Sequence, residues 1–201
     1  MQENVLKKEE PGNGGEAILK LEEVQKQIAE IKTQMEALSK ATPSNKISMI
    51  VFSGDLDKVL ASFIIATGAV AMGMDVVMFF TFWGTSVLRD QQKKVGDKDF
   101  MGKMFGSMLP KGTGAVKLSK MNMGGMGTAM MKSLMKKKNV ASLDQMIEMA
   151  GELGVQIYVC EMSMDLMGFK REEFIQYPHM DFCGVAKFLE DAQDSKVQLF
   201  I

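Results

Sequence analysis

The sequence has little cysteine, little histidine and almost no net charge. Its 201 residues contain two cysteines and one histidine, and 24 basic side chains are balanced by 25 acidic ones. Cys160 and Cys183 are too far apart for a CxxC redox pair, and too few for a four-ligand zinc site or a disulfide framework. A net charge of -1 supplies no field that would attract nucleic acid or an anionic membrane. We therefore expect no nucleic-acid partner, no bound metal and two reduced thiols.

The sequence also lacks a recognisable export signal and a clear membrane span. The first ten residues are charged and have no apolar core, so we expect a cytoplasmic protein. Between Leu60 and Val87 the only charged residue is Asp75, and a hydropathy window would register this run as a span. Gly73 and Asp75 mark a turn that divides the run into a helix and a β-rich segment. We therefore expect a buried helix and strand of an α/β core.

The N-terminal part divides into a tail, a helix and a linker. Residues 1–15 end in a Pro-Gly-Asn-Gly-Gly sequence and are expected to be disordered. Residues 16–40 are predicted to form a coiled-coil-like helix, and residues 41–45 a linker, because Pro43 disfavours helix. The helix either self-associates through its seam or lies on its own domain and frays. The seam residues alternate at spacings of three and four: Leu21, Val24, Ile28, Ile31, Met35 and Leu38.

Residues 46–201 show strands alternating with helices. The predicted strands cover residues 46–52, 76–82, 155–160 and 197–201, and the predicted helices 56–72, 85–90, 142–153, 163–168 and 185–194. Ser142 and Gln145 form a capping-box pattern that starts one of these helices. Residues 92–138 resist assignment except for a helix near 126–136. The pattern predicts an α/β, Rossmann-like domain, a mostly parallel sheet of about five strands with helices on both faces.

Cys160 is the residue best placed for chemistry. It ends a predicted strand and precedes a helix whose expected N-cap is Ser163, and ligands of open parallel sheets bind at this carboxyl edge. A helix N-terminus stabilises the nucleophilic thiolate, whereas Glu161 would raise the thiol pKa if it pointed inward. Cys183 lies before the last predicted helix and would convert a persulfide into a disulfide if the two sulfurs met. The alternative for either cysteine is a thiol packed in the core.

Other motifs are weaker. Ser53-Gly54-Asp55 follows the first strand but belongs to no phosphate-loop pattern, so a helix cap is favoured and no cofactor is expected. The 21 methionines favour adaptable packing or a docking surface, with Cu(I) binding through thioethers as an alternative. The single His179 would have to approach Cys160 to form a nucleophile pair. A basic run at Lys132 and residues 136–138 suits an anionic substrate, an acidic carrier or simply a solvated helix end.

Several blocks of sequence together resemble the DsrE/DsrF-like family, in the branch sometimes labelled peroxiredoxin-family or DsrE-like. The resemblance covers about residues 46–201 and excludes the N-terminal helix. It implies that Cys160 carries a persulfide or thiosulfonate, that TusA-like sulfur carriers are partners, and that the protein is a homo-oligomer. The matching blocks are IVFSGDLDK at 50–58, GMDVVMFFTFWG at 73–84, LSKMNMGGMG at 118–127, YVCEMSMDLMG at 158–168 and GVAKFLEDA at 184–192.

The sequence therefore predicts a cytosolic sulfur-transfer protein, a sulfurtransferase or sulfur carrier, in which an anionic sulfur compound or a protein donor loads Cys160. Cys183 and Ser163 are secondary candidates at the same site. The rival hypothesis is a non-enzymatic assembly module that uses the heptad helix and the methionine-rich segment, and a Cu(I)-binding protein is a further alternative.

Overall fold

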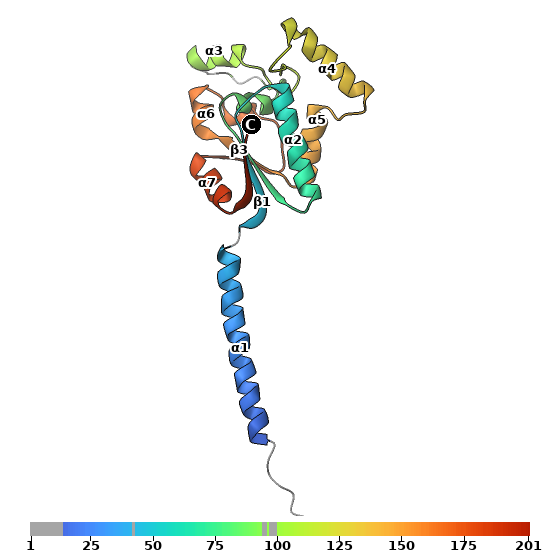
Figure 1. Cartoon of the computed structure of the whole chain (residues 1–201). Helices are drawn as coiled ribbons and strands as arrows, with labels where there is room; N and C mark the ends of the chain where they lie inside the picture. Colours follow the sequence, from blue (N-terminus) through green and yellow to red (C-terminus); the bar gives the residue numbers. More distant parts are fainter. Residues whose placement is uncertain (1–13, 42, 94–95, 97–99) are drawn as a thin grey trace, which may run out of the picture. The chain divides into compact units, whose positions relative to one another are not determined.

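The computed structural model describes residues 14–41, 43–93, 96 and 100–201, which belong to two units (Figure 1). The first unit ends at Pro43 and contains helix α1; the second extends from Ser44 to Ile201. The expected tail of residues 1–15 lies outside the described residues except for Gly14 and Gly15, which begin α1.

Helix α1 (Gly14–Ala41) has 28 residues and contains the whole of the predicted heptad segment. A single helix cannot bury its own apolar seam, and the seam side chains from Leu21 to Leu38 are all exposed, with Ile28 the least exposed at 47%. The helix is thus polar on most of its surface and carries one apolar stripe, which is typical of a coiled-coil strand.

The second unit is built on a five-stranded sheet in the order β4-β3-β2-β1-β5. Within the described residues, every pair of neighbouring strands is parallel. Parallel strands are buried on both faces, which explains the nearly continuous apolar run of β2. The predicted α/β fold with a mostly parallel sheet is confirmed. The strands are β1 (Ser44–Val51), β2 (Asp75–Phe80), β3 (Gln156–Cys160), β4 (Met180–Cys183) and β5 (Ser195–Phe200).

Helices and short 3-10 turns connect the strands. At the start of α5, Ser142 Oγ accepts a hydrogen bond from the Gln145 backbone N–H at 3.3 Å, and Gln145 Oε1 accepts one from the Ser142 N–H at 2.8 Å. The predicted capping box is thereby confirmed. The connecting elements are α2 (Leu56–Ala71), η1 (Phe82–Leu88), α3 (Phe100–Met108), η2 (Met123–Gly125), α4 (Met126–Lys137), α5 (Leu143–Glu152), α6 (Glu161–Leu166), η3 (Arg171–Glu173) and α7 (Val185–Gln193).

Helices cover both faces of the sheet (Figure 1). Alternate residues of β1, such as Met49 and Val51, belong to the main core with α2 and α5, and Phe63 of α2 packs there at 6.0 Å from the Phe80 ring. The opposite face carries a smaller cluster, in which Phe188 of α7 lies 5.2 Å from the Phe79 ring. Alternation of side chains along each strand thus assigns every strand residue to one of two layers.

The apolar run between Leu60 and Val87 is divided as predicted. Helix α2 ends at Ala71, Gly73 has a positive φ of 75°, and β2 begins at Asp75. No helix in the described part of the chain combines the length and the apolar character needed to cross a bilayer.

Three sequence expectations were wrong in detail. Residues 180–183 form β4, a strand that had been missed because four residues including Asp181 are too short to show a period-two pattern. β1 begins at Ser44, inside the expected linker, because Ser44 N–H and Oγ both donate to Asp194 O, at 2.8 and 2.7 Å. The helical segment expected near 85–90 is present, but it runs from Phe82 to Leu88 and is the 3-10 helix η1.

The segment from residue 92 to 138, unassigned from sequence, contains α3, η2 and α4, and α4 confirms the helix expected near 126–136. Hydrogen bonds join this segment to the start of α2. Leu56 N–H donates to Lys117 O at 2.8 Å, and the Asp57 carboxylate accepts from the backbone N–H and the hydroxyl of Ser119 at 2.8 and 2.6 Å. Residues 94–95 and 97–99 of this segment lie outside the described residues.

Candidate functional site

Two thiols lie side by side at the carboxyl edge of the sheet. Cys160 is the last residue of β3 and Cys183 the last residue of β4, and the two are register partners across the parallel pair. Both are free. The carboxyl ends of parallel strands are where ligands bind in open α/β sheets. The structure therefore places both predicted cysteines at the edge where chemistry is expected.

Each cysteine directly precedes a helix. α6 begins at Glu161, with Cys160 itself as the N-cap, and α7 begins at Val185, after the N-cap Gly184. The expectation that Ser163 would be the N-cap was wrong because the N-cap of α6, Cys160, lies three residues earlier. Ser163 is fully buried inside α6, and its hydroxyl is 2.8 Å from Thr81 Oγ1. It therefore links α6 to the end of β2.

The two thiols differ in exposure. Cys160 is 3% exposed and packs in the α7-face cluster with Phe79, Tyr158 and Phe188. Cys183 is half-buried at the edge of the same cluster. A reagent in solvent therefore reaches Cys183 more readily than Cys160.

Charges around Cys183 oppose its ionisation. Burial, together with Glu161, Cys160 and Asp181, raises the pKa of the Cys183 thiol to about 11, and Lys187 acts in the opposite direction. Glu161 forms an ion pair with Arg171, whose guanidinium carbon is 5.0 Å from the Phe182 ring centroid. The Cys183 thiol is therefore protonated at neutral pH.

His179 does not pair with Cys160. It is exposed and precedes β4, and its carbonyl accepts a hydrogen bond from Ile157 N–H at 2.8 Å. From this start of β4 to Cys183 is four residues, roughly 13 Å along a strand. The structure excludes the hypothetical His–Cys nucleophile pair in this conformation.

The loop after β1 forms a helix start, as expected. Asp55 is the N-cap residue of α2, although its carboxylate makes no cap hydrogen bond and instead accepts from Ser53 Oγ at 2.9 Å. The close approach of η1 also requires glycine, because a Cβ on Gly84 would lie 2.2 Å from Val51 O. This loop is packed tightly against the neighbouring turn.

The methionine-rich segment presents apolar side chains to solvent. Met121, Met123, Met126 and Met130 are between 62% and 75% exposed, whereas Met135 is buried. These four side chains therefore do not contribute to the core packing favoured from sequence, and a docking surface stays a prediction. The described residues contain no group of three or more His, Cys, Asp or Glu side chains arranged to hold a metal ion, and Cu(I) binding through methionine stays a prediction.

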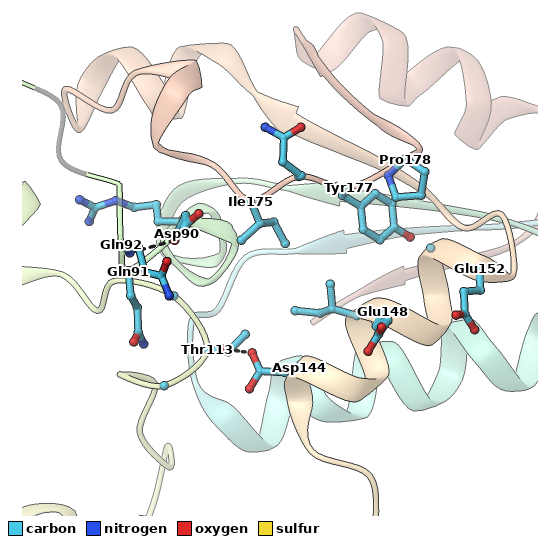
Figure 2. Close-up of a pocket in the computed structure, with 16 residues that line it drawn as sticks. Asp90, Gln91, Gln92, Thr113, Asp144, Glu148, Glu152, Ile175, Tyr177 and Pro178 are labelled. Atoms are coloured by element: carbon cyan, nitrogen blue, oxygen red, sulfur yellow. Dashed lines mark hydrogen bonds between the residues drawn. The ribbon is translucent and has the colours of Figure 1, made fainter.

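A pocket of about 590 Å³ lies away from the cysteines and was not anticipated from sequence. Figure 2 shows it between α5 and the segments near residues 90–92, 113 and 175–178. Its walls are acidic, with the carboxylates of Asp90, Asp144, Glu148 and Glu152. Neither Cys160 nor Cys183 lines it. Because like charges repel, an anionic sulfur compound is a poor ligand for this pocket.

Comparisons with known proteins agree with the geometry of the α/β unit. The model of the DsrE/DsrF/DrsH-like family matches residues 43–200. The uncharacterized protein YrkE of Bacillus subtilis (strain 168) is 46% identical over 158 residues, covering 79% of this chain and 98% of that protein. The sulfur carrier protein DsrE2 of Allochromatium vinosum is 34% identical over 157 residues, covering 78% and 98%.

Among solved structures, the ychN protein from E. coli aligns with a TM-score of 0.48 and 11% sequence identity, covering 78% of this chain and 98% of that one. The family match covers the sheet, the two cysteines and the helices that follow them, and it begins after the end of α1. The chain belongs to the DsrE/DsrF/DrsH-like family.

Proposed function

We propose that the chain works in sulfur relay and carries sulfur on Cys160 as a persulfide or a thiosulfonate. The observation that carries the proposal is the position of Cys160, at the carboxyl end of β3 and at the N-cap of α6. Family membership and a relative named as a sulfur carrier support a role in sulfur relay. A thiol at this edge of the sheet supplies the nucleophile that such a role requires.

Loading follows ordinary thiolate displacement. With a persulfide donor, the Cys160 thiolate attacks the outer sulfur, and the donor thiolate leaves. With thiosulfate the thiolate takes the outer sulfur and sulfite leaves; with tetrathionate it takes an S₂O₃ unit and thiosulfate leaves. Each reaction balances without an external oxidant. An acceptor thiol then removes the sulfur by the same attack in reverse.

The burial of Cys160 suits a carrier. At 3% exposure, the sulfur lies beneath α7 and against aromatic side chains. This placement shields a bound persulfide from bulky thiols in the surrounding solvent. We infer that small anionic donors and a docked partner, rather than bulky reagents, exchange sulfur with Cys160.

We also propose an acceptor, a compartment and an oligomeric state for the protein. The acceptor is a TusA-like sulfur carrier, the compartment is the cytoplasm, and the protein is a homo-oligomer. The exposed seam of α1 supports self-association, because an apolar stripe on an otherwise polar helix gains stability only when another surface covers it. The exposed methionines near α4 support protein docking, because flexible thioether side chains adapt to a partner.

Mass spectrometry tests the proposal. The purified protein is incubated with thiosulfate, tetrathionate or a persulfide donor, desalted and analysed intact and after digestion. We expect one added sulfur atom, or one added S₂O₃ unit with tetrathionate, on the peptide that contains Cys160. Cys160→Ser removes this product, and Cys183→Ser, the matched control, still acquires it. Equal labelling of Cys160→Ser and the wild type would disprove the proposal.

A second candidate function is a non-enzymatic assembly module. The exposed seam of α1 and the exposed methionines favour it. This function predicts that Cys160→Ser leaves partner binding and biological activity unchanged, whereas removal of residues 16–40 abolishes them. Complementation of a deletion strain with the two variants separates the two functions.

A further inference from the structure

Cys160 and Cys183 are the only two cysteines of the chain, and the sheet places them next to each other. They are register partners, and both side chains belong to the α7 face. Neighbouring strands lie about 4.8 Å apart, and the Cα atoms of disulfide-bonded cysteines lie about 4.4–6.8 Å apart. The backbone spacing is therefore already that of a disulfide.

The backbone near Cys183 has few structural neighbours that would resist a small movement. β4 has four residues and lies at the edge of the sheet, and its ladder with β3 ends at the Cys160–Cys183 pair. The next residue is Gly184, and no atom lies within 4 Å of the position that a Cβ would take there. Small adjustments that bring the two sulfurs into bonding distance therefore disturb little of the structure.

The difference in exposure gives the two thiols different roles. A persulfide on Cys160 is shielded from thiols in solvent, whereas Cys183 is its neighbour within the same fold. A neighbouring group held in place reacts at a very high effective concentration compared with a free reagent. Cys183 is thus the thiol best positioned to attack a sulfur species carried by Cys160.

We propose that Cys183 is a resolving thiol that releases the sulfur carried by Cys160 as hydrogen sulfide, an activity that rests on the persulfide of the proposed function. The Cys183 thiolate attacks the inner sulfur of the Cys160 persulfide. A Cys160–Cys183 bond forms, the bond to the outer sulfur breaks, and the outer sulfur leaves as HS⁻. The proton of the Cys183 thiol is taken up by the sulfide. The outer sulfur is reduced while Cys183 is oxidised, so the step needs no external oxidant.

The charges around Cys183 set the rate of this step. Glu161 of α6, Asp181 of β4 and Cys160 of β3 add to burial in raising its pKa to about 11, and Lys187 of α7 opposes them. Tyr158 lies in the same cluster and has a raised pKa, because of burial and of Asp191, so it is neutral at physiological pH. Because the thiolate is the attacking form, sulfide release is slow at neutral pH. Its rate rises about tenfold for each unit of increasing pH until the pH reaches about 11. A carried persulfide therefore survives long enough to be transferred.

The experiment follows sulfide and disulfide together. The full-length protein is loaded with a persulfide donor, desalted and incubated at several pH values without added thiol. Free sulfide is quantified, and the disulfide is detected by peptide mapping after alkylation. We expect one sulfide for each Cys160–Cys183 disulfide, with a rate that rises with pH. Cys183→Ser and Cys183→Ala retain the persulfide, and Asp181→Asn releases sulfide faster because it removes a negative charge near Cys183.

The controls separate this inference from the proposed function. Glu148→Gln, an exposed change on α5, which packs on the opposite face of the sheet, should release sulfide at the wild-type rate. Sulfide release from Cys183→Ser at the wild-type rate, or release without a disulfide, overturns the resolving role and leaves the carrier role intact. A wild type that acquires no sulfur overturns both. Oxidation of unloaded protein with diamide then shows independently whether the two thiols bond, and failure to form the intramolecular disulfide also overturns the inference.

Discussion

A buried ion pair holds the segment that joins the two cysteine strands. Arg89 Nη2 donates to Glu173 Oε2 at 2.9 Å, and the two side chains are 3% and 2% exposed. The Arg89 guanidinium carbon also lies 4.3 Å from the centre of the Phe169 ring, and Glu173 Oε1 accepts from Lys170 N–H at 3.0 Å. These contacts connect the end of η1 to η3, which lies between Cys160 and Cys183 in the sequence.

Removing one member of this pair should destabilise the protein strongly. In Glu173→Gln, the Arg89 charge stays buried without its carboxylate, and such a loss costs about 3–5 kcal/mol of unfolding free energy. Urea unfolding followed by circular dichroism measures the change. Glu190→Gln, which breaks an exposed pair with Lys187, should leave the unfolding curve nearly unchanged. Equal, small effects of the two substitutions would show that the buried pair is not a structural anchor.

At the scale of elements, α1 is the part of the chain with an apolar surface and no core of its own. With Leu21, Ile28 and Met35 at one set of seam positions, the flanking positions between residues 20 and 38 are Lys20, Gln25, Gln27, Lys32 and Gln34. In a parallel pair, Lys20 of one copy would lie opposite Gln25 of the other, and Gln27 opposite Lys32. Like charges therefore do not meet, and a second copy of the same helix is an acceptable partner.

Charges placed in the seam should prevent this self-association. In a pair of helices, the double substitution Ile28→Lys and Ile31→Lys puts four lysines into the core, whereas Ala29→Lys puts two on the outer surface. Sedimentation velocity should show loss of the oligomer for the first variant and retention for the second. Circular dichroism should show an intact α/β unit in both. An unchanged sedimentation coefficient for the double variant would assign oligomerisation to another surface.

The elements differ in how far sequence could predict them. The long helices and buried strands were predictable because their apolar periods extend over many residues, and the start of α5 was predictable because its capping box is local. β4 was not, since its pattern is too short and its pairing with β3 is non-local. Missing β4 also hid the register pairing of Cys183 with Cys160. Sequence reasoning thus named both cysteines as candidates but could not predict that they are neighbours across the β3–β4 pair.

The acidic pocket was missed for a related reason. Asp144 and Glu148 both belong to α5, whereas Asp90 lies more than fifty residues earlier in the chain, and only the tertiary fold brings Asp90 to them. The expected N-cap position of Ser163 was also wrong, because an N-cap three residues earlier makes Ser163 a buried residue inside the helix. Local patterns predict elements, whereas sites that depend on the exact packing of several elements require the structure.

At the scale of the whole molecule, the contact between Asp57 and Ser119 links stability to pH. Burial alone would raise the pKa of Asp57, but the two hydrogen bonds from Ser119 hold it below its ordinary value. A carboxylate whose pKa is lower in the folded state stabilises the fold above its unfolded pKa, about 3.9, and this contribution is lost as pH falls through the folded pKa.

Asp57→Asn should therefore destabilise the protein at neutral pH and much less in acid. Urea midpoints of wild type and variant should differ at pH 7 and converge as pH falls below about 4. Asp75→Asn, on the exposed first residue of β2, is the matched control and should show no such convergence. A constant difference at all pH values would mean that Asp57 acts through its shape and not its charge.

The register of β3 and β4 also has a consequence in chain entropy. A bond between Cys160 and Cys183 would close a loop of a little over twenty residues that contains α6, η3 and the Glu173 anchor. Closing a loop of this length restricts the unfolded chain and adds about 3 kcal/mol to the unfolding free energy. The oxidised protein should therefore melt several degrees above the reduced protein in differential scanning calorimetry, with Cys183→Ser showing no shift. The thermal stability of the entire α/β unit would then report whether Cys160 and Cys183 are bonded to each other.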